Sequence, residues 1–177
     1  MTEPQPSIGL KPGTVKLVPY SAEWPRKFAE ESARIRSALG SKALAVEHIG
    51  STAISGLDAK PIIDMAVAIE SLADMPACVV RLSKEGYEYK GEYGLPGRHF
   101  FTSGEPTRFH VHVVEQTSNH WRVWLQFREH LLKNETVRNE YNQVKRELAK
   151  QHADNRDAYT AGKNPFISRI LKQIGAP

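Results

Sequence analysis

A short run of small and hydroxyl-bearing residues precedes a single carboxylate inside an apolar segment. Gly50, Ser51 and Thr52 form the run, and Asp64 follows Ser51 after twelve intervening residues, within the apolar stretch 61–69. A glycine lets backbone N–H groups approach a phosphate closely, and the hydroxyl groups can also donate hydrogen bonds. A buried carboxylate is costly unless it is paired or binds a cation. Together these groups are what nucleotide–Mg²⁺ chemistry requires.

Two histidines on a later segment could join this carboxylate. His110 and His112 are two residues apart, so they share one face of a strand. If that strand neighbours Asp64, one or both imidazoles could complete a metal site. Two histidines and one carboxylate suit Zn²⁺, Mn²⁺ or Fe²⁺ better than Mg²⁺. The alternative is that one histidine packs in the core and the other hydrogen-bonds Asp64, and the sequence leaves both open.

Several other polar residues could face the same site. Lys60 precedes Pro61, which restricts it to an extended conformation, so it is either a phosphate ligand or a solvated loop lysine. His48 could face the site or be a hydrogen-bonded core histidine. Arg98 follows a glycine-rich turn and could approach a ligand. Arg128 could do so too, although a lone arginine on a helix more often joins a salt-bridge network.

Composition narrows the class of protein. The 177 residues carry 24 Lys and Arg against 20 Asp and Glu, a net charge of +4, which is too small for a dedicated nucleic-acid binder. The single cysteine, Cys78, excludes an internal disulfide and a multi-cysteine metal site, and its place on an apolar stripe predicts a core residue. No apolar run approaches the roughly 18 residues of a membrane span. Without a signal sequence, the expected location is cytoplasmic.

The pattern of apolar residues predicts one α+β domain. Residues 1–13 carry prolines and no periodicity, which predicts a mobile N-terminal arm before a single domain at 14–177. The first predicted elements are an edge strand at 15–18, a helix at 21–39, a strand at 44–49, a doubly buried strand at 61–69 and a helix at 73–85. Strands at 87–90, 98–102 and 108–115 follow. Three helices come after them, and the first begins at about residue 119. Strands mixed with helices, followed by a run of helices, favour a mixed sheet with a helical C-terminal part.

The segment VEHIGSTAISGLDAKPIID at 46–64 closely resembles the signature of the GrpB family, within the nucleotidyltransferase-fold superfamily of the polymerase-beta type. The likeness covers roughly residues 15–172. It includes residues 20–25, the strand around His110 and His112, the FREHL run at 127–131, and the spaced Tyr141, Lys145, Tyr159 and Lys163. Some relatives are fused to dephospho-coenzyme A kinase. The resemblance implies a nucleotidyltransferase-like mixed sheet flanked by helices.

The resemblance also implies roles for individual residues. Gly50 and Ser51 would be the phosphate-binding turn, and Asp64 would be the first metal-binding carboxylate. The second carboxylate of the superfamily falls on Ala66, which cannot bind metal and so speaks against the usual two-metal catalysis. Helices beyond the sheet supply a lysine and a tyrosine to the nucleotide in several relatives. Here those helices would supply Lys145, Tyr159 and Lys163, which are otherwise surface residues of amphipathic helices.

Three functions follow as expectations. The first is a metal-dependent transfer of a nucleotidyl or other phosphoryl-type group from a nucleotide such as ATP to a small acceptor, with Mg²⁺ or Mn²⁺ as the cofactor and Zn²⁺ as a further option. The second, which Ala66 favours, is a non-catalytic nucleotide or coenzyme A binding module. The third is a metal-dependent hydrolase that uses Asp64, His110 and His112. A nucleic-acid partner is not expected, and the oligomeric state is not indicated.

Overall fold

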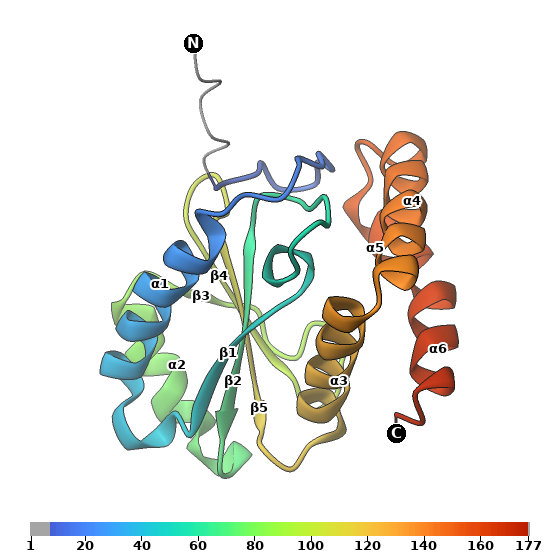
Figure 1. The fold of residues 1–177 in the computed structure, drawn as a ribbon. Coiled ribbons are helices and arrows are strands. Elements are labelled where there is room, and N and C mark those ends of the chain that lie inside the picture. The colour runs from blue at the N-terminus through green and yellow to red at the C-terminus, as the bar shows by residue number, and fades with distance from the viewer. Residues whose placement is uncertain (1–7, 177) are drawn as a thin grey trace.

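The computed structural model describes residues 8–176, and a five-stranded sheet lies at its centre (Figure 1). The strands are ordered β1 (Ala45–Ile49), β2 (Ile63–Ile69), β5 (Phe109–Glu115), β4 (His99–Ser103) and β3 (Glu88–Tyr89). β2 and β5 run parallel, whereas the other neighbours are antiparallel. The mixed sheet confirms the α+β class, and each predicted strand from 44 onward lies within two residues of its expected place.

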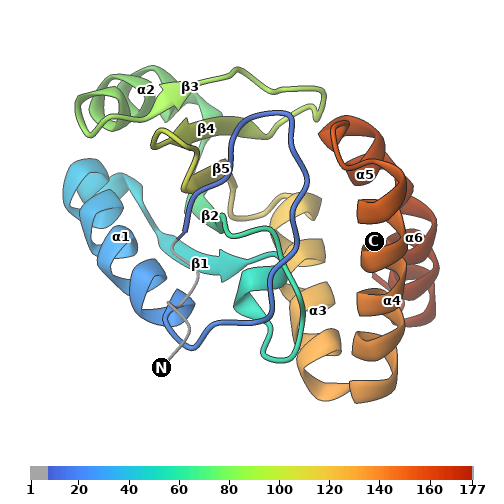
Figure 2. The same cartoon turned by 90° about the horizontal axis from the view of Figure 1, so that it is seen from above.

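Strand alternation separates the two faces of the sheet. One face packs against α1 (Trp24–Leu39) and α2 (Met75–Lys84), and this core includes Ile63 and the predicted core residue Cys78. The other face packs against α3 (Asn119–Lys133), with Ala66 and Trp121 in contact. Figure 2 shows α1 and α2 on one side of the sheet and α3 on the other. Side chains two residues apart on β2 and β5 therefore share one environment.

The central strand is buried on both faces, as its apolar run predicts. In β2 every residue is buried except Asp64, which is intermediate. α1 has Pro25 in its first turn, where a missing N–H costs nothing, and it ends at Gly40 as expected. Three short 3₁₀ helices complete this part: η1 (Gly40–Lys42), η2 (Ser51–Ala53) and η3 (Leu72–Asp74).

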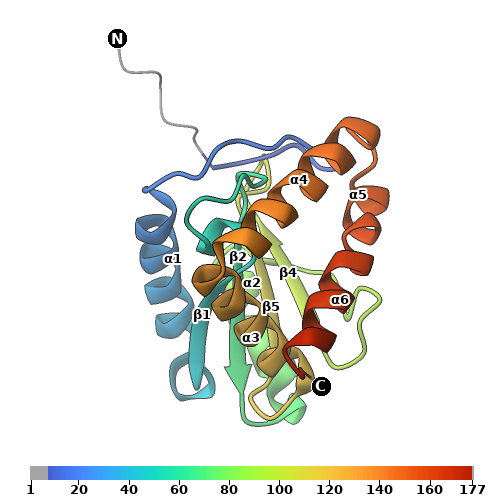
Figure 3. The same cartoon turned by 45° about the vertical axis from the view of Figure 1, so that its right-hand side comes forward.

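Three helices follow α3 and form a separate layer (Figure 3). They are α4 (Glu135–Gln151), α5 (Arg156–Gly162) and α6 (Asn164–Gln173). The sequence predicts three helices from about residue 119, but the described residues form four, because α5 is too short to show a helical period. Asn134 and Asn155 cap α4 and α5 through their side chains. The hydrophobic core of these C-terminal helices includes Tyr141 and Phe166, together with Ile54 of the loop after β1.

The N-terminal segment differs from its prediction. Residues 15–18 form no strand, since Val18 makes only an isolated bridge with Ala59. Residues 1–7 of the predicted arm lie outside the described residues. The rest of the arm is fixed to the domain, because Leu10 is buried and bridges Thr107. Among the described residues of the arm, Ile8 and Leu10 therefore pack against the domain. Across residues 8–176, no helix combines the length and the apolar character needed to cross a membrane.

Candidate functional site

The turn after β1 lies directly against Asp64. Ile49, the last residue of β1, is paired with Asp64 in the sheet register. Gly50 has φ +71°, which side chains disfavour, and a Cβ placed on it would lie 2.9 Å from Asp64 Oδ2. Only glycine fits this close approach, which explains its place before Ser51. This geometry confirms the prediction that the small-residue turn lies next to the carboxylate.

Asp64 is held by the two histidines of β5. His110 Nδ1 lies 3.1 Å from Asp64 Oδ1, and His112 Nε2 lies 3.6 Å from the same oxygen. The Asp64 side chain remains 28% exposed. Burial opposes its ionisation, but the hydrogen bonds from both histidines outweigh burial and hold the pKa of the carboxyl well below its usual value. Asp64 is therefore an ionised group facing two imidazoles.

Arg98 is the second partner of His112. It is 5% exposed, and its Nη1 lies 3.1 Å from His112 Nδ1. Its other donors bond the carbonyl oxygens of Glu92 and Tyr93. Burial lowers the pKa of His112, so its neutral form is favoured. The sequence placed Arg98 near a ligand, whereas the structure places it behind a histidine.

The residues around Asp64 do not fit a metal centre built by the protein. Within residues 8–176, no three His, Cys, Asp or Glu side chains are arranged to hold a metal ion. Ala66, where the second carboxylate would stand, is paired with Glu47 on one side and His112 on the other. Glu47 is committed to Arg128 at 2.8 Å, and His112 is committed to Arg98. Neither neighbour replaces the missing carboxylate.

Lys145 reaches the turn from α4. Its Nζ lies 3.1 Å from Ser51 Oγ, also donates to the Asp58 carbonyl oxygen, and sits 5.0 Å from the ring centre of Tyr141. The predicted sharing of one helical face by Lys145 and Tyr141 is thereby confirmed. Lys145 is only 1% exposed, and burial, with a smaller effect of the Lys163 charge, lowers its pKa to about 7.

Two more lysines flank the ring of Tyr159. Lys163 Nζ lies 5.0 Å and Lys60 Nζ 5.7 Å from its ring centre. Burial lowers the pKa of Lys60 to about 8, and the charges of Lys163 and Asp64 act on it in opposite directions. Burial also lowers the pKa of Lys163, which Asp64 opposes. We call Lys60, Lys145 and Lys163 the lysine cluster. Tyr159 is 2% exposed and covered by two lysines, so the structure offers no open ring on which a base could stack.

Arg156 is a site residue that the sequence did not indicate. It begins α5, and its side chain donates to the carbonyl oxygens of Thr14 and Lys11 in the N-terminal segment. Burial lowers its pKa, while the charge of Asp64 favours its protonated form. The same arginine also acts on Lys60. No local pattern around residue 156 signals this position, because the long-range fold creates it.

Three predicted site residues have structural roles. His48 lies on the α1 face of β1, where it stacks on Phe28 with ring centres 4.8 Å apart, and its Nε2 lies 2.9 Å from Thr52 Oγ1. Burial lowers the pKa of His48 to about 4. Thr52 is 1% exposed, so its hydroxyl serves this histidine. Arg128 donates to the Glu47 carboxylate and to the His48 carbonyl oxygen, so it forms a salt bridge within the fold.

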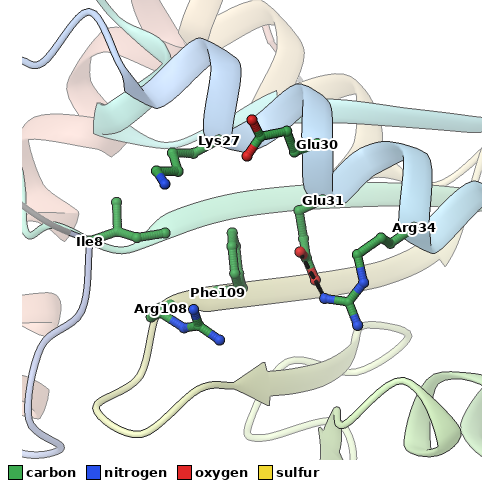
Figure 4. A pocket seen from close by; sticks show the side chains of 7 residues that line it. All are labelled: Ile8, Lys27, Glu30, Glu31, Arg34, Arg108 and Phe109. Atoms are coloured by element: carbon green, nitrogen blue, oxygen red, sulfur yellow. Dashed lines mark hydrogen bonds and ion pairs between the residues drawn. The ribbon is translucent and has the colours of Figure 1, made fainter.

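A separate cavity lies on the opposite face of the sheet (Figure 4). Its volume is about 320 Å³, and it is bounded by one stripe of α1, the start of β5 and Ile8. Its two carboxylates are committed to arginines, since Glu31 bonds Arg34 and Glu30 bonds Arg26. The cavity contains none of the residues that surround Asp64.

Comparison with known proteins gives a consistent picture. The family model described as GrpB protein matches residues 14–173. The "Glutamate-rich protein GrpB" of Alkalihalophilus pseudofirmus is 33% identical, over 94% of this chain and 99% of that protein. A crystal structure of the conserved protein GrpB from Enterococcus faecalis superposes with a TM-score of 0.82 at 34% identity, covering 89% of this chain and 96% of that one.

Other relatives are longer proteins. The "UPF0157 protein YqkA" of Bacillus subtilis is 36% identical over 86% of this chain, which spans only 45% of that protein. A protein named dephospho-CoA kinase from Mycolicibacterium paratuberculosis is 32% identical over 86% of this chain and 44% of its own length. The Cid1 poly(U) polymerase matches with a TM-score of 0.42 at 12% identity, a likeness too low to support an inference.

Proposed function

This chain belongs to the GrpB family, and we propose that it binds a nucleotide through its phosphates and transfers a nucleotidyl or related phosphoryl-type group to a small acceptor. Ser51 and the lysine cluster would hold the phosphates. The resemblance of residues 46–64 to the signature of the GrpB family, within the nucleotidyltransferase-fold superfamily, supports the reaction class. The geometry around Asp64 supports the phosphate-binding part.

The observation that carries the proposal is an imbalance of charge. Asp64 is the carboxylate whose charge acts on Lys60, Lys163 and Arg156 together. Burial, and then the charge of Lys163, lower the pKa values of Lys60 and Lys145. Asp64 opposes the shift of Lys60, and Asp58 opposes that of Lys145. A bound polyanion would relieve the repulsion between these cations and favour their protonated forms. The site is therefore prepared for a ligand with several negative charges.

The roles of the residues follow from their donors. Ser51 Oγ accepts a hydrogen bond from Lys145, so its own hydrogen is free to point to a phosphate oxygen. Lys60 and Lys163 would neutralise the phosphates and the charge that develops on a leaving pyrophosphate. Because the protein groups do not fit a metal centre, the proposal assigns charge neutralisation to these lysines.

Titration calorimetry with ATP tests the binding step, with and without Mg²⁺ or Mn²⁺. Each of Lys60→Met and Lys163→Met is expected to weaken ATP binding by about 10- to 100-fold, the effect of one hydrogen bond to a charged group. The exposed Lys172→Met is the matched control and should bind like the wild type. Absence of ATP binding, or equal affinities for all three variants, would refute the proposal.

A second candidate is a binding module without transfer, and Ala66 is the observation that favours it. Pyrophosphate release from ATP in the presence of small hydroxyl acceptors separates the two functions. Tight binding without release supports the module. Because one relative is named dephospho-CoA kinase, dephospho-coenzyme A and coenzyme A belong in the same calorimetric series.

A further inference from the structure

Four side chains form a continuous chain of contacts across β4, β5 and β2. Arg98 Nη1 lies 3.1 Å from His112 Nδ1, His112 Nε2 lies 3.6 Å from Asp64 Oδ1, and His110 Nδ1 lies 3.1 Å from the same oxygen. Phe100 packs on both imidazoles, with ring centres 5.1 Å and 5.0 Å away. The two histidine side chains are 13% and 14% exposed. Their rings are thus held in place by packing as well as by polar contacts.

This chain determines where the imidazole hydrogens lie. An arginine can only donate, so His112 Nδ1 must accept, and the hydrogen of neutral His112 lies on Nε2, facing Asp64. The ionised Asp64 can only accept, so His110 carries its hydrogen on Nδ1. The lone pair of neutral His110 is therefore on Nε2. That atom has no hydrogen-bond partner anywhere in the described part of the chain.

We propose that His110 Nε2 is the general base that accepts the proton of the acceptor hydroxyl, and that Asp64, His112 and Arg98 are positioning residues. This inference rests on the proposed transfer reaction. As the proton moves to Nε2, the hydroxyl oxygen forms a bond to the nucleotide phosphorus. The bond from that phosphorus to the pyrophosphate oxygen breaks, and its electron pair leaves with pyrophosphate. Asp64 stabilises the imidazolium that results, as a carboxylate does in a Ser-His-Asp triad.

The same arrangement prevents the histidines from sharing a metal ion. His112 Nε2 could bind a metal only if its hydrogen moved to Nδ1, where it would face the N–H of Arg98. His110 has its free nitrogen on the side of the ring away from Asp64. The contacts therefore favour proton transfer over the hydrolase site that the residue types suggested.

Imidazole tautomers can be read directly by long-range ¹⁵N–¹H NMR on the full chain. The expected result is hydrogen on Nδ1 of His110 and on Nε2 of His112. Arg98→Met should allow His112 to populate both tautomers while His110 keeps its own. A wild-type His110 with its hydrogen on Nε2 would overturn the assignment, because the proposed lone pair would not exist.

Kinetics then test the catalytic role. His110→Asn keeps an N–H for Asp64 but removes Nε2, so kcat for pyrophosphate release from ATP should fall about 10²- to 10⁴-fold. The Kd for ATP and the thermal unfolding curve should stay unchanged, and His130→Asn on α3 is the matched control. Unchanged kcat in His110→Asn overturns the general base alone. ATP binding with no release by the wild type overturns the transfer reaction together with the general base and leaves the binding module. Failure of the wild type to bind ATP overturns the proposed function itself.

Discussion

Glu31 on α1 and Asp64 on β2 lie on opposite faces of the sheet, and each carboxylate faces two side chains inside the protein. Glu31 accepts a hydrogen bond from Tyr87. It also accepts one from Arg34, 3.1 Å away (Figure 4). Asp64 faces His110 and His112. Glu31 thus has a permanent cation as its partner, whereas both partners of Asp64 are imidazoles. The charges of Lys60 and Lys163 interact with the charge of Asp64 through space and not through a hydrogen bond.

From this difference we infer that Glu31 is a structural carboxylate and that Asp64 belongs to the proposed binding site. The charge of Glu31 is balanced within the fold, so nothing further is needed to stabilise it. Around Asp64, the lysine cluster and Arg156 leave positive charge uncompensated, at a cost in desolvation that the protein carries without a ligand. Such an imbalance supports the proposal that this site binds an anionic ligand.

The largest effect on stability should come from changing Gly50, which lies in close contact with Asp64. Gly50→Ala is expected to cost about 3 kcal/mol in unfolding free energy, from left-handed backbone strain and a clash with Asp64. Gly86 has φ +85° with nothing within 4 Å of an added Cβ. Gly86→Ala therefore isolates the strain, at about 1 kcal/mol. Urea unfolding measures both, and equal losses would mean that Asp64 does not need the space.

The stability of the protein should also depend on pH in the neutral range, because of the buried Lys145. The folded pKa of Lys145, about 7, is below its ordinary 10.5, so between these values the unfolded chain binds more protons and stability rises with pH. From pH 7 to 9 the wild type should gain about 2 kcal/mol relative to Lys145→Met. Lys172→Met should follow the wild type. Parallel curves for wild type and Lys145→Met would contradict the lowered pKa.

Neutralising each carboxylate tests the comparison directly. Glu31→Gln should lower the unfolding free energy by about 1.5 kcal/mol, because a hydrogen bond to a charged group is weakened, and leave ATP binding unchanged. Asp64→Asn should strengthen ATP binding, because it removes a negative charge beside the lysine cluster. Calorimetry with and without Mg²⁺ decides the point. Weaker binding of Mg²⁺–ATP by Asp64→Asn would indicate a metal bridge instead.

The smallest effect concerns the neutral donor to Glu31. Tyr87→Phe should cost about 1 kcal/mol, because Tyr87 is buried and its hydroxyl bonds the carboxylate. Tyr89→Phe is the matched control: its hydroxyl lies 2.6 Å from His99 Nδ1 at an exposed position. That change should cost less than about 0.5 kcal/mol. Equal losses would mean that burial of the Glu31 pair adds nothing.

Much of the fold could be predicted from local pattern. The apolar run of β2, the alternation of β5 and the period of α1 each depend on near neighbours in the sequence. The pairing of Lys145 with Tyr141 on one face of α4 could be predicted for the same reason. The short α5 and the packed segment from Ile8 could not, because their order comes from distant contacts.

The site was predictable in its residue types but not in its roles. The sequence brought Asp64, His110 and His112 together as metal ligands or as a hydrogen-bonded pair. The contact of Arg98 with His112 supports the hydrogen-bonded arrangement that we propose, and only the fold shows this contact. His48 and Arg128 were candidates by proximity in sequence, yet strand alternation turns His48 toward Phe28, and Arg128 is taken up by Glu47.

The sequence by itself determined the α+β class, the GrpB family and the meeting of a glycine turn with one carboxylate, because these follow from local periodicity and a contiguous motif. The tertiary structure alone decided that the charge of Arg156 acts on Lys60, that Tyr159 is covered and that His110 Nε2 has no hydrogen-bond partner among the described residues. Those properties depend on which groups desolvate and hydrogen-bond one another across distant segments, and spacing along a chain carries no information about that.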